Sequence, residues 1–157
     1  MNYRETLKIN SKGHLEIGGV DCLQLAREFK TPLYALDEKH IRDMCKAYID
    51  SLKEYYGQGK ALYASKALCC KAMYKIMTDE GMGADVVSGG ELYTALAGGM
   101  EGKDIYFHGN NKTEEEIVFA LNSGVHAIVV NGPEEIKFLD SICNRENKKA
   151  GVLLRVN

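Results

Sequence analysis

The residue type best suited to chemistry in this sequence is a lysine that directly follows a short apolar run. Residues 60–67 read KALYASKA, and Lys66 stands where the apolar run ends and a helical pattern begins. A strand that ends there would hold the Lys66 backbone rigidly while the following loop opens toward a ligand. Most lysines are simply exposed surface residues, but a partly desolvated amine in such a place can form a Schiff base with a carbonyl compound.

Three further residues that could do chemistry end apolar runs in the same way, namely Asp85, His108 and Arg155. Because catalytic groups of a barrel gather at the carboxyl ends of its strands, we expect all of them to face the same mouth as Lys66. Asp85 could instead be an ordinary loop carboxylate, and His108 a structural histidine in a turn. Arg155 is costly to bury without a partner, which favours an anion in a pocket beside it.

The elements that must position these residues are short β-prone runs separated by helical patterns. The predicted strands are Leu33–Leu36, Ala61–Ser65, Ala84–Val87, Asp104–Phe107, His126–Val130 and Gly151–Val156. Strand, helix and strand at intervals of about 25 residues predict a parallel α/β sheet, either doubly wound or closed as a (β/α)₈ barrel. The last run has no helix after it, and a complete barrel needs about 250 residues. We therefore expect a TIM-type barrel truncated after about six strands.

Helix signals support the same alternation. Apolar residues recur at helical spacing from Ile41 to Leu52, which predicts the first long helix. Ser88 with Glu91 and Thr113 with Glu116 fit capping boxes, and Pro133 fits a first turn. Residues 1–30 have a different rhythm, with a hairpin-like piece over 14–20 and a short helix over 21–29. They are predicted to form a separate amino-terminal segment, and residues 31–157 the partial barrel.

Composition excludes several function classes. The net charge is −2 and lysines are scattered among carboxylates, so we expect neither nucleic acid nor a membrane surface as a partner. No signal sequence or membrane span is evident, which indicates a cytoplasmic protein. The five cysteines lack metal-ligand spacing, so no metal site is expected. The glycine-rich stretches match neither a dinucleotide fingerprint nor a P-loop, and no serine-hydrolase or zincin motif occurs.

Several stretches resemble, in order and spacing, the alanine-racemase-like PLP decarboxylases, also called fold type III. They are YASKA at 63–67, TPLY at 31–34, GADVVSGGEL at 83–92, FHGNNKT at 107–113 and LLRVN at 153–157. The resemblance covers essentially all of residues 31–157. The 108–113 stretch is more closely similar to the branch of the family that acts on diaminopimelate.

The resemblance implies a PLP-dependent amino-acid decarboxylase that converts meso-diaminopimelate to L-lysine and carbon dioxide. It implies that Lys66 binds pyridoxal 5'-phosphate as a Schiff base, with Ala64, Asp85, His108 and Arg155 as further cofactor-binding residues. The remaining site residues are expected beyond Asn157, some of them from the second subunit of a homodimer. Residues 1–30 are expected to associate with a carboxyl-terminal β-domain.

Three alternatives remain open at this point. A related decarboxylase would take ornithine, arginine or carboxynorspermidine, and the residues that read the far end of the substrate are not in this sequence. A non-enzymatic PLP-binding barrel protein would share the fold, although residues 1–30 argue against it. A fragment that binds nothing is a third possibility.

Overall fold

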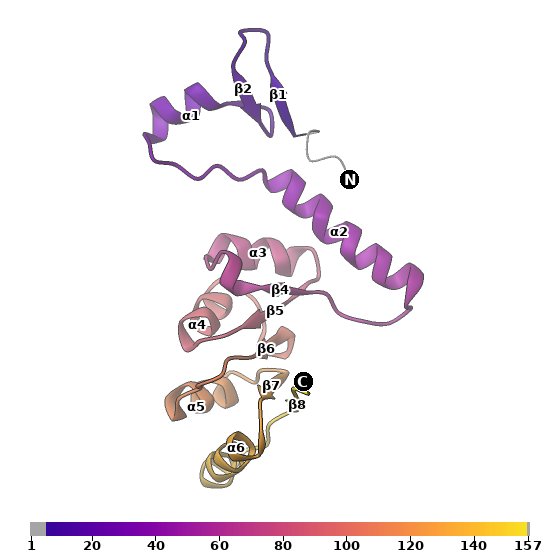
Figure 1. Cartoon of the computed structure of the whole chain (residues 1–157), viewed down its shortest axis with the longest axis vertical. Coiled ribbons are helices and arrows are strands. Elements are labelled where there is room, and N and C mark those ends of the chain that lie inside the picture. The colour runs from indigo at the N-terminus through magenta and orange to yellow at the C-terminus, as the bar shows by residue number, and fades with distance from the viewer. Residues whose placement is uncertain (1–5, 157) are drawn as a thin grey trace. The chain divides into compact units, whose positions relative to one another are not determined.

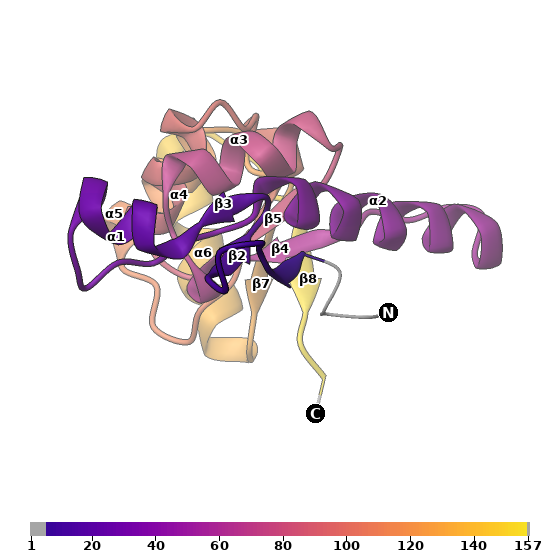
Figure 2. The same cartoon turned by 90° about the horizontal axis from the view of Figure 1, so that it is seen from above.

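The structure, a computed structural model, describes residues 6–156 in two compact units, Met1–Tyr48 and Ile49–Asn157. The division falls within α2 (Glu38–Tyr55), which is a single unbroken helix (Figures 1 and 2). Helix α2 includes all of the long helix predicted from Ile41 to Leu52. None of the described helices is long and apolar enough to cross a membrane.

The first unit begins with a small antiparallel sheet and a short helix. Strands β1 (Leu7–Ile9), β2 (Leu15–Ile17) and β3 (Val20–Asp21) pair in chain order, and α1 (Cys22–Phe29) follows at once. Gly18 and Gly19 both have positive φ, which is what a two-residue turn between β2 and β3 requires. The predicted hairpin and short helix are confirmed, and β1 is an additional strand.

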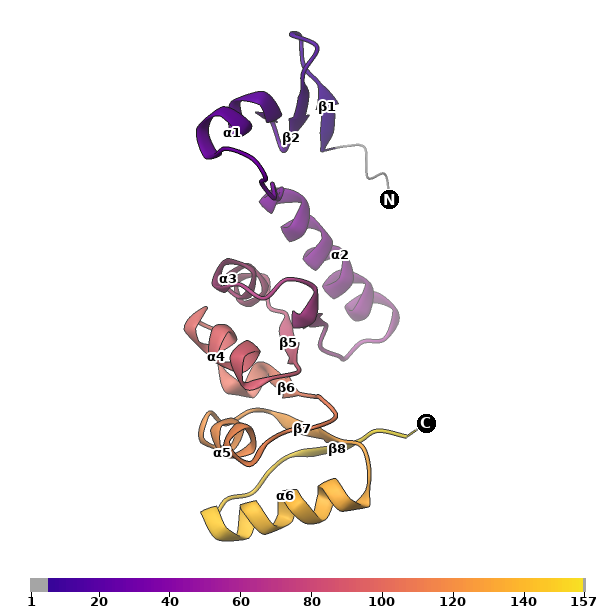
Figure 3. The same cartoon turned by 60° about the vertical axis from the view of Figure 1, so that its left-hand side comes forward.

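The second unit is a five-stranded parallel sheet with helices along one side (Figures 1 and 3). Its strands are β4 (Leu62–Ala64), β5 (Gly83–Val86), β6 (Ile105–Phe107), β7 (Ala127–Val130) and β8 (Val152–Leu154). Its helices are α3 (Lys71–Asp79), α4 (Gly89–Ala97), α5 (Glu114–Asn122) and α6 (Pro133–Glu146). The spatial order follows the chain, whereas a doubly wound sheet reverses its strand order at a switch point. The α/β architecture is therefore that of consecutive units of a (β/α)₈ barrel.

Burial alternates along the strands and defines two faces. Ala84 and Val86 on β5, and Ile105 and Phe107 on β6, are fully buried. Asp85 on β5 and Tyr106 on β6, which lie between these pairs, are only half-buried. Successive strand residues point to opposite faces. The four apolar residues therefore form the core against the helices, and Asp85 lies on the other face.

The prediction of a strand at Leu33–Leu36 is wrong. The segment carries no ladder pairing, and the described parallel sheet begins at β4. Tyr34 is 97% exposed, and Leu33 and Leu36 are exposed as well. An apolar run is a strand only where a neighbouring strand accepts and donates its backbone hydrogen bonds. The sheet thus contains five of the six expected strands.

The helix starts follow their sequence signals. Thr113 and Glu116 form a complete capping box at α5, and Pro133 occupies the first turn of α6. At α4 the Ser88 hydroxyl accepts from the Glu91 amide, but the Glu91 carboxylate accepts from the amide of Val87, one residue earlier than a capping box would have it. The Glu91 bond closes the turn that follows β5.

Glycines stand where the amino ends of the strands approach neighbouring backbone. A Cβ on Gly102, just before β6, would lie 1.9 Å from the carbonyl oxygen of Ser123. A Cβ on Gly83, the first residue of β5, would lie 2.4 Å from the carbonyl oxygen of Asp104. Lys60 forms an ion pair with Asp104 at the same end of the sheet. At the amino ends of the strands, the backbone at Gly83 and Gly102 therefore lies directly against neighbouring backbone.

Candidate functional site

Lys66 follows β4 directly and lies in a single 3₁₀ turn, Ser65–Ala67. The turn is held from both sides, because Ser65 is fully buried and the Tyr63 hydroxyl donates a 2.9 Å hydrogen bond to the carbonyl of Leu68. The Lys66 side chain itself is exposed. The place at a strand end is as predicted, but the side chain is exposed, whereas the Schiff-base interpretation called for a partly desolvated amine.

Asp85 and His108 lie together on the face of the sheet that points away from the buried core. In the parallel register Ala64 is the partner of Asp85, and Asp85 is the partner of Tyr106. The amide of His108 donates to the carbonyl of Val86 at 2.7 Å, so the ladder continues one residue past β6. Residues two apart on a strand share a face, which places His108 on the face of Asp85.

The two side chains are close enough to act on the same group. His108 Nδ1 lies 3.7 Å from Asp85 Oδ2, and both side chains are about one-third exposed. His108 Nε2 is buried and has no hydrogen-bond partner within residues 6–156. A buried ring nitrogen without a hydrogen-bond partner is uncommon in a folded protein.

Arg155 lies at a strand end, as predicted. It follows β8 and is exposed, and its amide donates to the carbonyl of Val130 at 2.9 Å. The anion or cofactor oxygen expected beside it stays a prediction, because the side chain meets no anionic partner among the described residues. The structure brings together Ala64, Asp85 and His108, and leaves the side chains of Lys66 and Arg155 exposed at the same end of the sheet.

These residues fit the pyridoxal phosphate that the sequence resemblance implies. The Lys66 amine forms no ion pair with any described residue, so it is available for a carbonyl carbon. Asp85 supplies a carboxylate on the strand next to the one that ends before Lys66, and His108 supplies the unpaired ring nitrogen. Within residues 6–156 there is no group of three histidine, cysteine or acidic residues that could hold a metal ion.

Two residues that help to build this site were missed by sequence reasoning. Tyr63 closes the Lys66 loop, and its ring packs edge-on against Tyr74 at a centroid distance of 6.4 Å. Lys112, in the loop that carries His108, is buried with only 2% of its side chain exposed. A tyrosine in a strand is an ordinary core residue, and no local pattern marks a lysine as buried.

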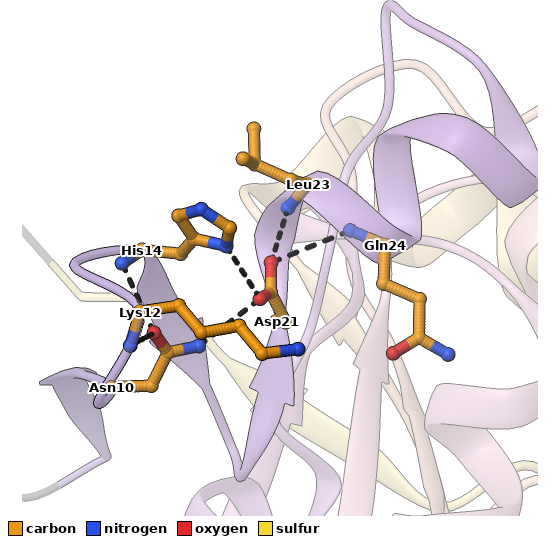
Figure 4. A network of polar contacts seen from close by, with 6 residues as sticks. All are labelled: Asn10, Lys12, His14, Asp21, Leu23 and Gln24. Carbon is orange, nitrogen blue, oxygen red and sulfur yellow. Dashed lines mark hydrogen bonds and ion pairs between the residues drawn. The ribbon is translucent and has the colours of Figure 1, made fainter.

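A second polar cluster occurs in the first unit and has a structural explanation (Figure 4). Asp21 Oδ1 accepts from the amide of Leu23 at the start of α1, while Oδ2 contacts His14 Nδ1 at 2.8 Å and Asn10 Nδ2 at 3.0 Å. The bond from His14 above all holds the pKa of Asp21 far below its ordinary value, against the opposing effect of desolvation. The cluster caps a helix and closes a hairpin.

Comparison with known protein families agrees with this geometry. Residues 38–157 match the family described as pyridoxal-dependent decarboxylase, pyridoxal binding domain. The match begins with α2 and includes every strand of the parallel sheet.

Individual relatives are similar over nearly the whole chain. The chain is 45% identical over 156 residues to diaminopimelate decarboxylase of Bacillus methanolicus, and 44% identical over 151 residues to that of Bacillus subtilis. A crystal structure of diaminopimelate decarboxylase from M. jannaschii in complex with L-lysine superposes with a TM-score of 0.88 at 33% identity, covering 99% of this chain. The chain spans 36% of the length of the B. methanolicus and M. jannaschii proteins and 34% of the B. subtilis protein.

Proposed function

The chain belongs to the family of pyridoxal-dependent decarboxylases, and from that premise we propose that the complete protein decarboxylates meso-diaminopimelate to L-lysine and carbon dioxide. The observation that carries the proposal is the 45% identity over 99% of the chain to a diaminopimelate decarboxylase. The complex of a structural relative with L-lysine, which is the proposed product, supports the same substrate.

Lys66 is the proposed anchor of the cofactor. With pyridoxal phosphate bound, Lys66 Nζ would hold the cofactor through its aldehyde carbon, and a substrate amine would displace it. The bound cofactor supplies an electron sink for the pair left when the bond to the carboxyl carbon breaks. The freed Lys66 amine can then carry a proton, because the rigid turn at 65–67 keeps it near the reacting carbon.

The remaining predicted residues have roles that follow from their positions. Asp85 presents a carboxylate that would steer protonation, and the one-third-exposed ring of His108 beside it would contact the cofactor. Ala64, next to Asp85 in the register, is small enough to leave room for a ring. Arg155 is exposed and is proposed to bind an oxygen of the cofactor in the complete protein.

The organisation of the complete protein is part of the proposal. We place it in the cytoplasm as a homodimer whose second subunit completes the site. Residues 1–30 are proposed to associate with a carboxyl-terminal β-domain, and residues 31–157 to form part of the barrel. The small sheet and helix at 7–29, whose strands pair only with one another, support treating this segment as a unit of its own.

Borohydride reduction of the cofactor-saturated complete protein, followed by peptide mapping, tests the site. Reduction fixes the cofactor to whichever lysine holds it, and we expect the label on Lys66. Label on another lysine would overturn the assignment of Lys66. No label at all would show that the protein does not use pyridoxal phosphate.

Carbon dioxide release from competing substrates tests the reaction. We expect kcat/KM for meso-diaminopimelate to exceed that for ornithine, arginine or carboxynorspermidine by roughly 100-fold or more, because the pocket must satisfy the polar far end of the substrate. A preference for one of the other amines would identify a related decarboxylase. A labelled Lys66 with no decarboxylation of any of them would identify a non-enzymatic barrel protein.

A further inference from the structure

Lys112 is a buried charge that the proposed chemistry does not use. Only 2% of its side chain is exposed, and Nζ donates hydrogen bonds to the carbonyls of Gly109 at 2.7 Å and Val129 at 2.8 Å. Nζ also lies 2.6 Å from Oε1 of Glu135. With two hydrogen bonds to carbonyls, an ion pair to Glu135 and almost no access to solvent, this ammonium cannot meet a substrate.

The contacts of Lys112 join the loop of residues 108–112 to the next βα unit. Val129 belongs to β7 and Glu135 to α6, whereas Gly109 follows His108 directly. The Gly109 carbonyl accepts a second hydrogen bond, 3.1 Å long, from the side-chain amide of Asn131. Two donors from different parts of the chain therefore fix the Gly109 carbonyl, one residue past His108.

The carboxylate of Glu135 is held as firmly as the ammonium. Its Oε2 accepts from the backbone amide of Asn131 at 2.7 Å and from the Asn131 side chain at 3.0 Å. Burial alone would raise the pKa of Glu135, but the bonds from Lys112 and Asn131 lower it below its ordinary value. Glu135 is thus ionised at neutral pH, as its ion pair with Lys112 requires.

A buried ion pair is a poor source of stability, since an apolar pair of similar volume is often as stable or more stable. An apolar side chain at position 112 could not donate to the Gly109 carbonyl, however. The ammonium of Lys112 therefore holds the loop of residues 108–112 in place, which an apolar side chain could not do.

We infer that Lys112, paired with Glu135, is a positioning residue that sets His108 beside Asp85 by fixing the Gly109 peptide. His108 is held at its own amide by Val86 and, one residue further on, at the Gly109 carbonyl by Lys112 and Asn131. Its Nδ1 consequently stays 3.7 Å from Asp85. The catalytic part of this inference rests on the proposed function, and the structural part does not.

The test compares two variants of the complete protein. Lys112→Met leaves Glu135 as a buried charge without its cation, so its melting temperature falls by several degrees. Lys112→Met with Glu135→Gln removes both charges and recovers most of that loss. Neither variant restores the Lys112 donor to the Gly109 carbonyl. Both therefore exchange the amide hydrogen of His108, which is bonded to the carbonyl of Val86, at least about tenfold faster than the parent protein.

Activity gives the second readout. Displacement of His108 by the loosened loop lowers kcat of the double variant by about 10- to 100-fold with a smaller change in KM. Lys60→Met is the matched control, because it breaks the Lys60–Asp104 ion pair at the amino end of the strands. It lowers the melting temperature without changing kcat or exchange of the His108 amide.

Each outcome decides the inference. Parental exchange of the His108 amide in the double variant would overturn it, whatever the activity. Faster exchange with parental kcat would overturn its catalytic part. If the complete protein decarboxylates no amino acid, the proposed function fails, and hydrogen exchange still decides whether Lys112 holds the His108 loop.

Discussion

The carboxylate of Glu116 on α5 accepts a 2.7 Å hydrogen bond from the amide of Gly89, the first residue of α4. Its other oxygen accepts from the amide of Thr113 in the capping box. One side chain therefore satisfies amides at the starts of two neighbouring helices. Both helices follow strands that end near the candidate site, so this carboxylate also fixes the turns beside it.

Glu116→Gln is expected to lower the free energy of unfolding by about 1–2 kcal/mol, because an amide can accept only one of the two bonds and turns a donor toward the other. Glu115→Gln, an exposed neighbour in the same turn, is the control and should change stability by less than about 0.5 kcal/mol. Urea unfolding of the complete protein measures both. Equal effects of the two variants would contradict the bridging role.

The same variant has a pH signature. Burial would raise the pKa of Glu116, but the bonds from Thr113 and Gly89 bring it below its ordinary value of 4.5. A carboxyl with a lowered pKa stabilises the folded state fully above the unfolded pKa and loses that contribution as the pH falls through the folded one. The difference between parent and Glu116→Gln should therefore be largest near neutral pH and shrink below pH 4.5.

Asp21 gives a prediction for the first unit. Asp21→Asn keeps an oxygen that can cap α1 but removes the charge that faces His14. Since the pKa of Asp21 lies below its ordinary value of 3.8, its contribution is complete above that pH and is lost only in stronger acid. The urea midpoint of the parent should exceed that of the variant at neutral pH, and the gap should close below pH 3.8. Glu28→Gln, an exposed change on the same helix, should leave the midpoint unchanged at all these pH values.

Lys66→Ala in the complete protein should abolish the visible absorption band of bound cofactor and stop decarboxylation. Lys71→Ala and Lys75→Ala, on the helix that follows, should do neither. This contrast separates the covalent role of Lys66 from a general loss of positive charge near a phosphate. A visible band that survives in Lys66→Ala, or disappears in Lys71→Ala, would place the anchor elsewhere.

The sequence predicted a strand correctly wherever an apolar run pairs with another strand of the parallel sheet. Runs such as Ala84–Val87 and His126–Val130 became β5 and β7 within one residue of the expected bounds, because burial on one face and helices at regular intervals leave a parallel sheet as the solution. Leu33–Leu36 is also an apolar run, but the structure assigns no strand there. Pairing is a long-range property that a local run does not encode.

The sequence predicted where the site residues lie along the strands, but not which of the charged side chains are buried. Lys66, Asp85 and His108 all lie at strand ends as expected. Arg155 is exposed, while Lys112 is buried and was not recognised. Burial of a charged side chain depends on its partner, and Glu135 lies 23 residues further along the chain than Lys112, on another helix.

Gly102 provides a prediction about the amino end of the sheet. Gly102→Ala should cost about 1–3 kcal/mol or more, because its Cβ would lie 1.9 Å from a backbone oxygen that cannot turn aside. Gly132→Ala is the control at the other end of the strands, with nothing within 4 Å of its Cβ. It should cost less than about 1 kcal/mol, the loss of a glycine cap on α6. Thermal unfolding that ranks the two the other way would contradict the contact.

The glycines at the amino end have a consequence for how this protein can change under mutation and selection. Where a strand starts against a neighbour's carbonyl, as at Gly83 and Gly102, any side chain collides with backbone, and variants there are removed for instability before their activity matters. The loops at residues 65–70 and 87–88 contain no glycine in such a contact and carry side chains at the ligand end of the sheet. In the loop at 108–111, Gly109 has a positive φ and its Cβ would lie 2.9 Å from the carbonyl oxygen of Val87, so that position must stay glycine. New substrate preferences are therefore reached by exchanging loop residues on an unchanged sheet, and a mutant library confined to these loops should yield far more folded variants than one spread over the strand starts.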